Sequence, residues 1–89
     1  MLTLQDCVGI SGLTAEEVGV IAEHDRVPEI VATEIGNALL TTPQGTYMLR
    51  RYILELLERA AEQGQLGREQ RLRDVLTNFN AAHPVPRVL

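Results

Sequence analysis

The chain has 89 residues, of which 45% are hydrophobic, and its formal net charge at pH 7 is −4. A chain of this length builds one hydrophobic core, so we expect a single helical domain over residues 1–84 followed by an extended tail at 85–89. The single cysteine excludes an internal disulfide. No window approaches the roughly 18 consecutive apolar residues of a membrane span. These properties predict a small soluble protein, with the cytoplasm as the expected compartment.

Helix start and stop signals are clear in the first third of the chain. Thr3 can cap a short helix over residues 4–10, which a Ser-Gly pair then ends. Thr14 and Glu17 have the spacing of a capping box, in which the hydroxyl and the carboxylate each accept a hydrogen bond from a free backbone amide. The second predicted helix therefore covers residues 15–25.

Proline and glycine divide the rest of the chain into three further helices. Pro28 suits a first helical turn, where its missing N–H has no partner to lose, and it begins a predicted helix at 28–40. The segment 42–45 is a turn cluster that ends this helix. No breaker interrupts residues 46–63, and two glycines separate that segment from a last helix at 68–82. The fold class is therefore all-α, as a compact bundle of about five short helices.

Apolar periodicity indicates how these helices pack. On the 46–63 helix, apolar side chains cover a wide arc, whereas on the 68–82 helix they form a narrow stripe. We expect the 46–63 helix at the centre of the bundle, with the 68–82 helix buried on one side only.

Charge is distributed unevenly along the chain. Residues 1–45 carry seven acids and one base, whereas residues 46–89 carry seven arginines and five acids. An acidic first half and a weakly basic second half could attract each other within the fold or between copies.

Three aliphatic residues depart from the amphipathic pattern. Val20 lies on the polar side of the 15–25 helix, and Ile30 and Leu40 lie on the polar side of the 28–40 helix. Single exposed aliphatics are ordinary on soluble proteins. The alternative is that these three form a candidate interface that is buried against another chain, most simply in a homodimer.

Arg50 is the charged residue that departs from the pattern. It projects into the apolar arc of the 46–63 helix, where a guanidinium must reach solvent or find a partner. We expect a structural ion pair between Arg50 and a carboxylate of the 15–25 or 28–40 helix. A direct contact with a binding partner is the alternative.

The sequence contains no convincing catalytic, metal or cofactor site. Cys7 could act as a nucleophile only beside a base, and the two histidines, His24 and His83, lie at predicted helix ends, where they favour a capping role. No glutamate stands three residues before either histidine, and neither nucleotide-binding glycine pattern is present. We expect no enzyme activity and no bound cofactor.

These observations favour a protein–protein interaction or regulatory adaptor module that binds a protein partner or itself. The alternative is a small nucleic-acid-binding regulator, because the 15–25 and 28–40 helices have the outline of a helix-turn-helix. Glu29 and Glu34 on the would-be recognition helix weigh against it, since DNA affinity comes largely from basic groups. A candidate basic patch for that role comprises Arg68, Arg71 and Arg73.

Overall fold

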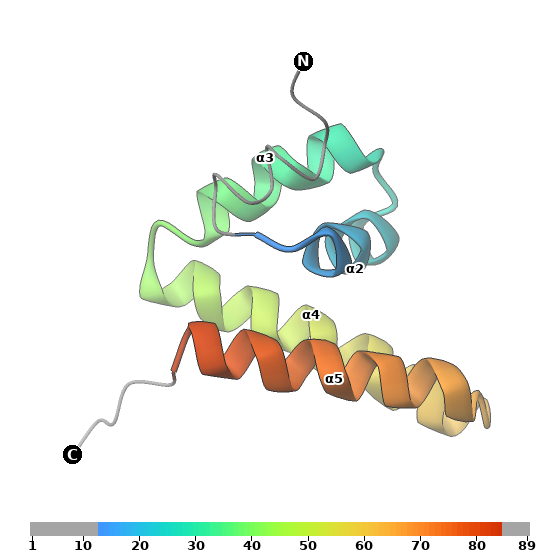
Figure 1. The fold of residues 1–89 in the computed structure, drawn as a ribbon. Helices are drawn as coiled ribbons and strands as arrows, with labels where there is room; N and C mark the ends of the chain where they lie inside the picture. Colours follow the sequence, from blue (N-terminus) through green and yellow to red (C-terminus); the bar gives the residue numbers. More distant parts are fainter. Residues whose placement is uncertain (1–12, 85–89) are drawn as a thin grey trace.

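The computed structural model describes residues 13–84 of the chain (Figure 1). Its helices are α2 (Ala15–Asp25), α3 (Glu29–Leu39), α4 (Pro43–Glu62) and α5 (Leu66–Ala82). No strand occurs within residues 13–84, which confirms the all-helical prediction. The helix predicted at 4–10 and the tail at 85–89 lie outside the described residues, so the helices described number four where the sequence predicted about five.

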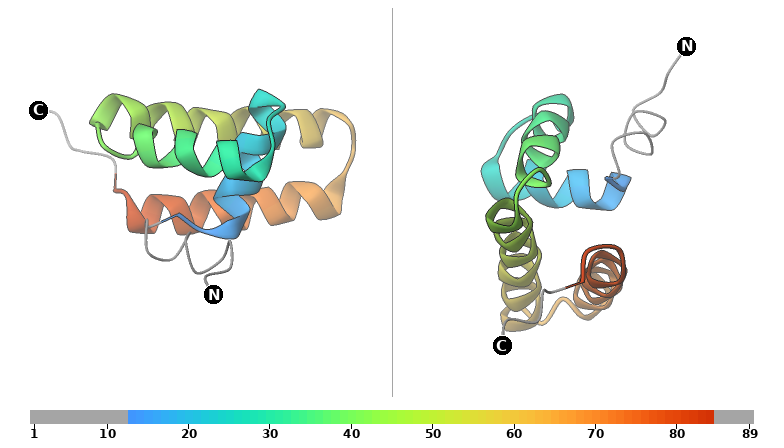
Figure 2. Two further views of the ribbon diagram at one scale, coloured as in Figure 1. Left: turned by 90° about the horizontal axis from the view of Figure 1, so that it is seen from above. Right: turned by 90° about the vertical axis from the view of Figure 1, so that its left-hand side faces the viewer.

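α4 contacts each of the other three helices, and α2 and α3 also pack against each other. α4 and α5 run antiparallel as a long hairpin, α3 lies against α4, and α2 runs crosswise beside these two helices on the side of α5 (Figures 1 and 2). The end of the hairpin that contains the α4–α5 turn projects beyond α2 and α3 in both figures. The result is a molecule with one protruding end.

The start of α2 follows the sequence prediction closely. Thr14 Oγ1 accepts a hydrogen bond from the Glu17 backbone amide at 3.1 Å, and Glu17 Oε1 accepts one from the Thr14 amide at 3.1 Å. Glu17 is only 2% exposed, so this carboxylate is part of the interior. Burial raises the pKa of Glu17 above its ordinary value, against the opposing hydrogen bond from Thr14.

The start of α4 differs from the prediction because Pro43 begins this helix where we expected a turn. Thr42 Oγ1 accepts a hydrogen bond from the Gly45 amide at 2.9 Å, and Pro43 occupies the first turn of α4. α4 therefore begins three residues before the predicted start at 46. Proline fits a first helical turn because its missing N–H has no partner to lose there. Pro28 itself precedes α3 as its N-cap residue.

The turn between α4 and α5 is tighter than predicted. Gly64 alone adopts the left-handed conformation within this turn, with φ at 69°. Gly67, which we expected to help end α4, instead lies in the first turn of α5, and that helix begins at Leu66 rather than at residue 68.

The core is aliphatic and centred on α4, as the wide apolar arc predicted. The largest fully buried side chains are Val18, Ile21, Leu49, Ile53, Leu56 and Phe79. Phe79 lies on the narrow stripe of α5, and its removal would cost about 3–5 kcal/mol of stability.

A glycine inside α3 explains how closely α2 and α3 approach. A Cβ at Gly36 would lie 2.8 Å from Leu13 Cδ1 and 3.0 Å from Ile21 Cδ1. Glycine at this position costs ~1 kcal/mol in helix propensity, but it leaves room for the Leu13 and Ile21 side chains to pack against the α3 backbone.

Candidate functional site

A groove of about 250 Å³ lies between α2 and the first half of α5, with α4 at its base. We call it the α2–α5 groove. Its apolar lining consists of Val20, Leu56, Leu72 and Val75. Gly19 of α2 also lines it, and a Cβ at this position would have no heavy atom within 4 Å. Unlike Gly36, Gly19 therefore has no packing reason within residues 13–84 for its place inside a helix.

Charged residues of opposite sign flank the groove. Glu16 and Glu23 come from α2, and Arg68 and Arg71 come from α5. Arg68 pairs with Glu23 and so links the two sides of the groove. Within residues 13–84, Glu16 and Arg71 form no ion pair. The groove therefore combines an apolar floor with one unpaired acid and one unpaired base.

The three residues of the candidate interface do not form one exposed patch. Val20 is 4% exposed and belongs to the core, so the prediction that it lies on an exposed face is wrong. The reason is that α2 packs against both α3 and α4, which leaves it a narrower solvent face than the sequence pattern indicates. Leu40 is partly buried against the core, whereas Ile30 is 70% exposed.

The candidate basic patch is partly neutralised by neighbouring acids. Arg68 pairs with Glu23, and Arg73 Nη2 lies 2.7 Å from Glu69 Oε2 one turn earlier on α5. Arg71 is exposed and lines the α2–α5 groove. The three arginines are therefore not equivalent, and Arg71 is the one that has no carboxylate partner within residues 13–84.

Arg50 binds α5, not the acidic first half of the chain. Its Nε donates to Asn80 Oδ1 at 2.7 Å and its Nη2 donates to the His83 carbonyl oxygen at 2.6 Å. The guanidinium also lies 5.3 Å from the centroid of the Phe79 ring. The predicted carboxylate partner from α2 or α3 is therefore corrected to neutral acceptors at the end of α5, whose free carbonyl groups attract a cation.

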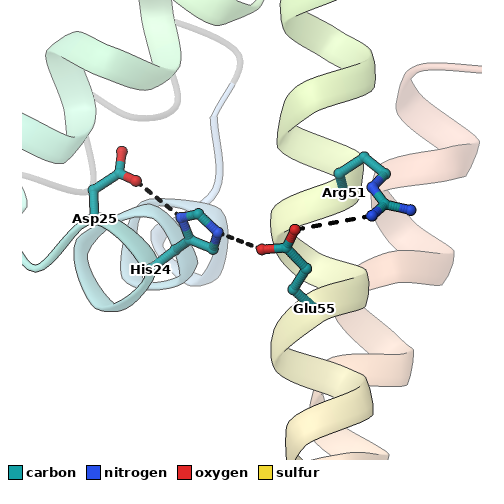
Figure 3. Close-up of polar contacts among 4 residues, drawn as sticks. All are labelled: His24, Asp25, Arg51 and Glu55. Atoms are coloured by element: carbon teal, nitrogen blue, oxygen red, sulfur yellow. Dashed lines mark hydrogen bonds and ion pairs between the residues drawn. The ribbon is translucent and has the colours of Figure 1, made fainter.

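A second polar cluster joins α2 to α4 at the end of α2 (Figure 3). His24 Nδ1 lies 2.9 Å from Asp25 Oδ1, and His24 Nε2 lies 2.5 Å from Glu55 Oε2. The Tyr52 ring stacks on the imidazole, with centroids 3.7 Å apart and planes at 13°. Arg51 Nη2 lies 3.9 Å from the other oxygen of Glu55. The sequence indicated only a helix-end histidine, and nothing in it paired His24 with a residue of α4.

This cluster favours the charged form of His24. A carboxylate can only accept, so both ring nitrogens donate at once only in the imidazolium. Burial lowers the pKa of His24, but the hydrogen bonds to Asp25 and Glu55 together raise it by more, and the net shift is upward. Burial also raises the pKa of Tyr52, and the two carboxylates add to that effect.

Within residues 13–84, no group of three or more His, Cys, Asp or Glu side chains could hold a metal ion. Cys7 lies outside the described residues. His83 packs its ring against Phe79, with centroids 4.8 Å apart, and its backbone amide donates a hydrogen bond to the Phe79 carbonyl oxygen. Among the helices described, none has the length and apolar character needed to cross a membrane.

Comparison of the chain with protein-family models, curated proteins and solved structures finds no match. Its function must therefore be argued from its own surfaces.

Proposed function

We propose that this chain is a small helical protein–protein interaction module and that the α2–α5 groove is its binding site. The observation that carries the proposal is the groove itself, an apolar floor beside a helix glycine that no other described residue packs against. Glycine inside a helix costs about 1 kcal/mol relative to alanine. A ligand that approaches the α2 backbone closely would offset that cost.

The chemistry of the groove suits a protein ligand. Apolar side chains of a partner can contact the exposed edges of Val20 and Leu72, which are 4% and 8% exposed, while Glu16 and Arg71 fix its orientation through opposite charges. The nucleic-acid alternative receives less support, since Arg68 and Arg73 already have carboxylate partners.

Gly19→Phe tests the proposal because a Cβ at this position meets no heavy atom within 4 Å, so a large side chain there extends into the groove from open space. The wild type, this variant and Gly67→Phe would be immobilised and exposed to an extract of the organism's own cells. Gly67 is the matched control, a helix glycine with equally open surroundings that does not line the groove.

The readout is the affinity of each protein identified in this way, purified and titrated by calorimetry. We expect Gly19→Phe to weaken binding at least about tenfold, whereas Gly67→Phe leaves it unchanged. A chain that binds no other protein and does not self-associate, or a partner indifferent to Gly19→Phe, would refute the proposal.

A further inference from the structure

The end of the α4–α5 hairpin supplies the convex counterpart to the groove. Leu66, at the start of α5, is 76% exposed, the highest value among the exposed large apolar side chains of residues 13–84. It lies on the end of the hairpin that projects beyond α2 and α3 (Figures 1 and 2). The molecule therefore has an apolar protrusion close in sequence to Arg68, which lines the groove.

We infer that the partner in the α2–α5 groove is a second copy of this chain, which inserts Leu66 of its projecting hairpin end. This inference rests on the proposed function and names its partner. A groove of about 250 Å³ has room for a leucine side chain, and its floor of Val20, Leu56, Leu72 and Val75 matches that side chain in polarity.

The charges beside the groove are self-complementary in such a pair. In a two-fold pair every contact between two different residues occurs twice. With Glu16 of one copy against Arg71 of the other, the same ion pair therefore forms on both sides of the axis. These are the two groove charges that form no ion pair within residues 13–84. A groove flanked by one sign of charge would repel its own copy.

Exchange of the two hairpin ends also closes the assembly. Each copy offers one hairpin end and one groove, and a two-fold axis uses both at once, so neither is left to recruit a third copy through the same contact. The expected product is a dimer and not a filament.

Sedimentation equilibrium on the full chain at tens of micromolar tests the inference. The wild type should sediment as a dimer, and Leu66→Ser should raise the dissociation constant at least about 100-fold, because each dimer loses two buried leucines. Ile30→Ser is the matched control, since Ile30 is 70% exposed and does not line the groove. That variant should remain a dimer, and both variants should keep the wild-type circular dichroism spectrum.

Charge reversal gives an independent test of the pairing. Glu16→Arg and Arg71→Glu should each weaken the dimer roughly tenfold or more, and the double variant should restore it, because both contacts then reappear with reversed polarity. If the partner were a different protein, the double variant would not restore binding, because the charges of that protein would be unchanged.

A disulfide between copies would locate the contact. In a Cys7→Ser background, chains carrying Gly19→Cys would be mixed with chains carrying Leu66→Cys and oxidised. We expect a cross-linked dimer on a non-reducing gel, and no such product when Ile30→Cys replaces Leu66→Cys.

A strictly monomeric wild type, or a dimer that Ile30→Ser dissociates and Leu66→Ser does not, would overturn the inference. In either case the groove could still hold a different protein, and the titrations with Gly19→Phe would decide that separately. Binding of such a protein to the Leu66→Ser variant would leave the proposed function standing without the second copy.

Discussion

The His24 cluster predicts a stability that depends on pH through a single side chain. His24→Phe is the informative change, because phenylalanine keeps a planar ring to stack on Tyr52 and loses both hydrogen bonds to carboxylates. It also leaves Asp25 and Glu55 without the cation between them. The variant therefore isolates the charge-assisted contacts from the packing.

The expected magnitude follows from those two hydrogen bonds. A hydrogen bond to a charged group contributes roughly 1.5–3 kcal/mol when it is shielded from solvent. The Glu55 side chain is 42% exposed, so screening reduces its share. We therefore expect His24→Phe to lower the free energy of unfolding by about 2 kcal/mol at a pH of about 5.5, where the imidazolium forms both bonds.

The direction of the pH dependence follows from the raised pKa of His24. Above its ordinary value of 6.5, the folded chain holds a proton that the unfolded chain has lost. The stability from the imidazolium is therefore complete below that value and declines as the pH rises through the folded-state pKa. The decline is at most ~1.4 kcal/mol per pH unit for one proton.

Urea unfolding followed by circular dichroism at several pH values measures this effect. The difference in the free energy of unfolding between the wild type and His24→Phe removes the contributions of the titrating groups that the two proteins share. It should shrink to less than about 1 kcal/mol near pH 9, where a neutral imidazole still donates one hydrogen bond. A difference that stays constant across this range would refute the assignment of the imidazolium.

Three further predictions concern the backbone and the caps. Gly45→Ala should destabilise the fold by more than about 3 kcal/mol, because the new Cβ would overlap the backbone carbonyl of Leu39 in α3. Gly19→Ala should stabilise the fold by about 0.5–1 kcal/mol, because alanine favours the helix and its Cβ meets no heavy atom within 4 Å. Thermal unfolding of the pair checks both signs. Arg50→Ala should lower the free energy of unfolding by about 1–2 kcal/mol, because two hydrogen bonds are lost. Arg51→Ala is the control and should lower it by less than about 0.5 kcal/mol, because the Arg51 side chain is half exposed. Equal melting temperatures of the two variants would contradict this prediction. Thr14→Ala should cost about 1 kcal/mol in urea unfolding through the lost cap.

Local signals in the sequence were sufficient for most helix boundaries. The capping box at Thr14 and Glu17 involves residues three apart, so the sequence contains both partners and their spacing. The boundary at Pro43 was misplaced because the same proline chemistry serves a turn and a first helical turn. Thr42, which caps the Gly45 amide three residues later, is the local signal that marks the helix start, and the prediction overlooked it.

The contacts between helices could not be predicted in the same way. Arg50 was expected to need a polar partner, but the choice of Asn80 and the His83 carbonyl depends on α5 returning alongside α4. The His24–Glu55 contact joins residues 31 positions apart and has no local signal. Val20 was misassigned for the same reason, since a single helix does not reveal how many neighbours cover it.

The fold also changes the meaning of the charge asymmetry seen in the sequence. One acid of the first half is neutralised by the second half, since Glu23 pairs with Arg68, and His24 of the first half binds Glu55 of the second. Glu16 and Arg71 remain beside the apolar floor of the groove. A ligand that covers the floor approaches both charges, so a ligand with a cation near Glu16 and an anion near Arg71 is favoured over one with a single sign of charge. That arrangement restricts the partner more than the net charge of either half does.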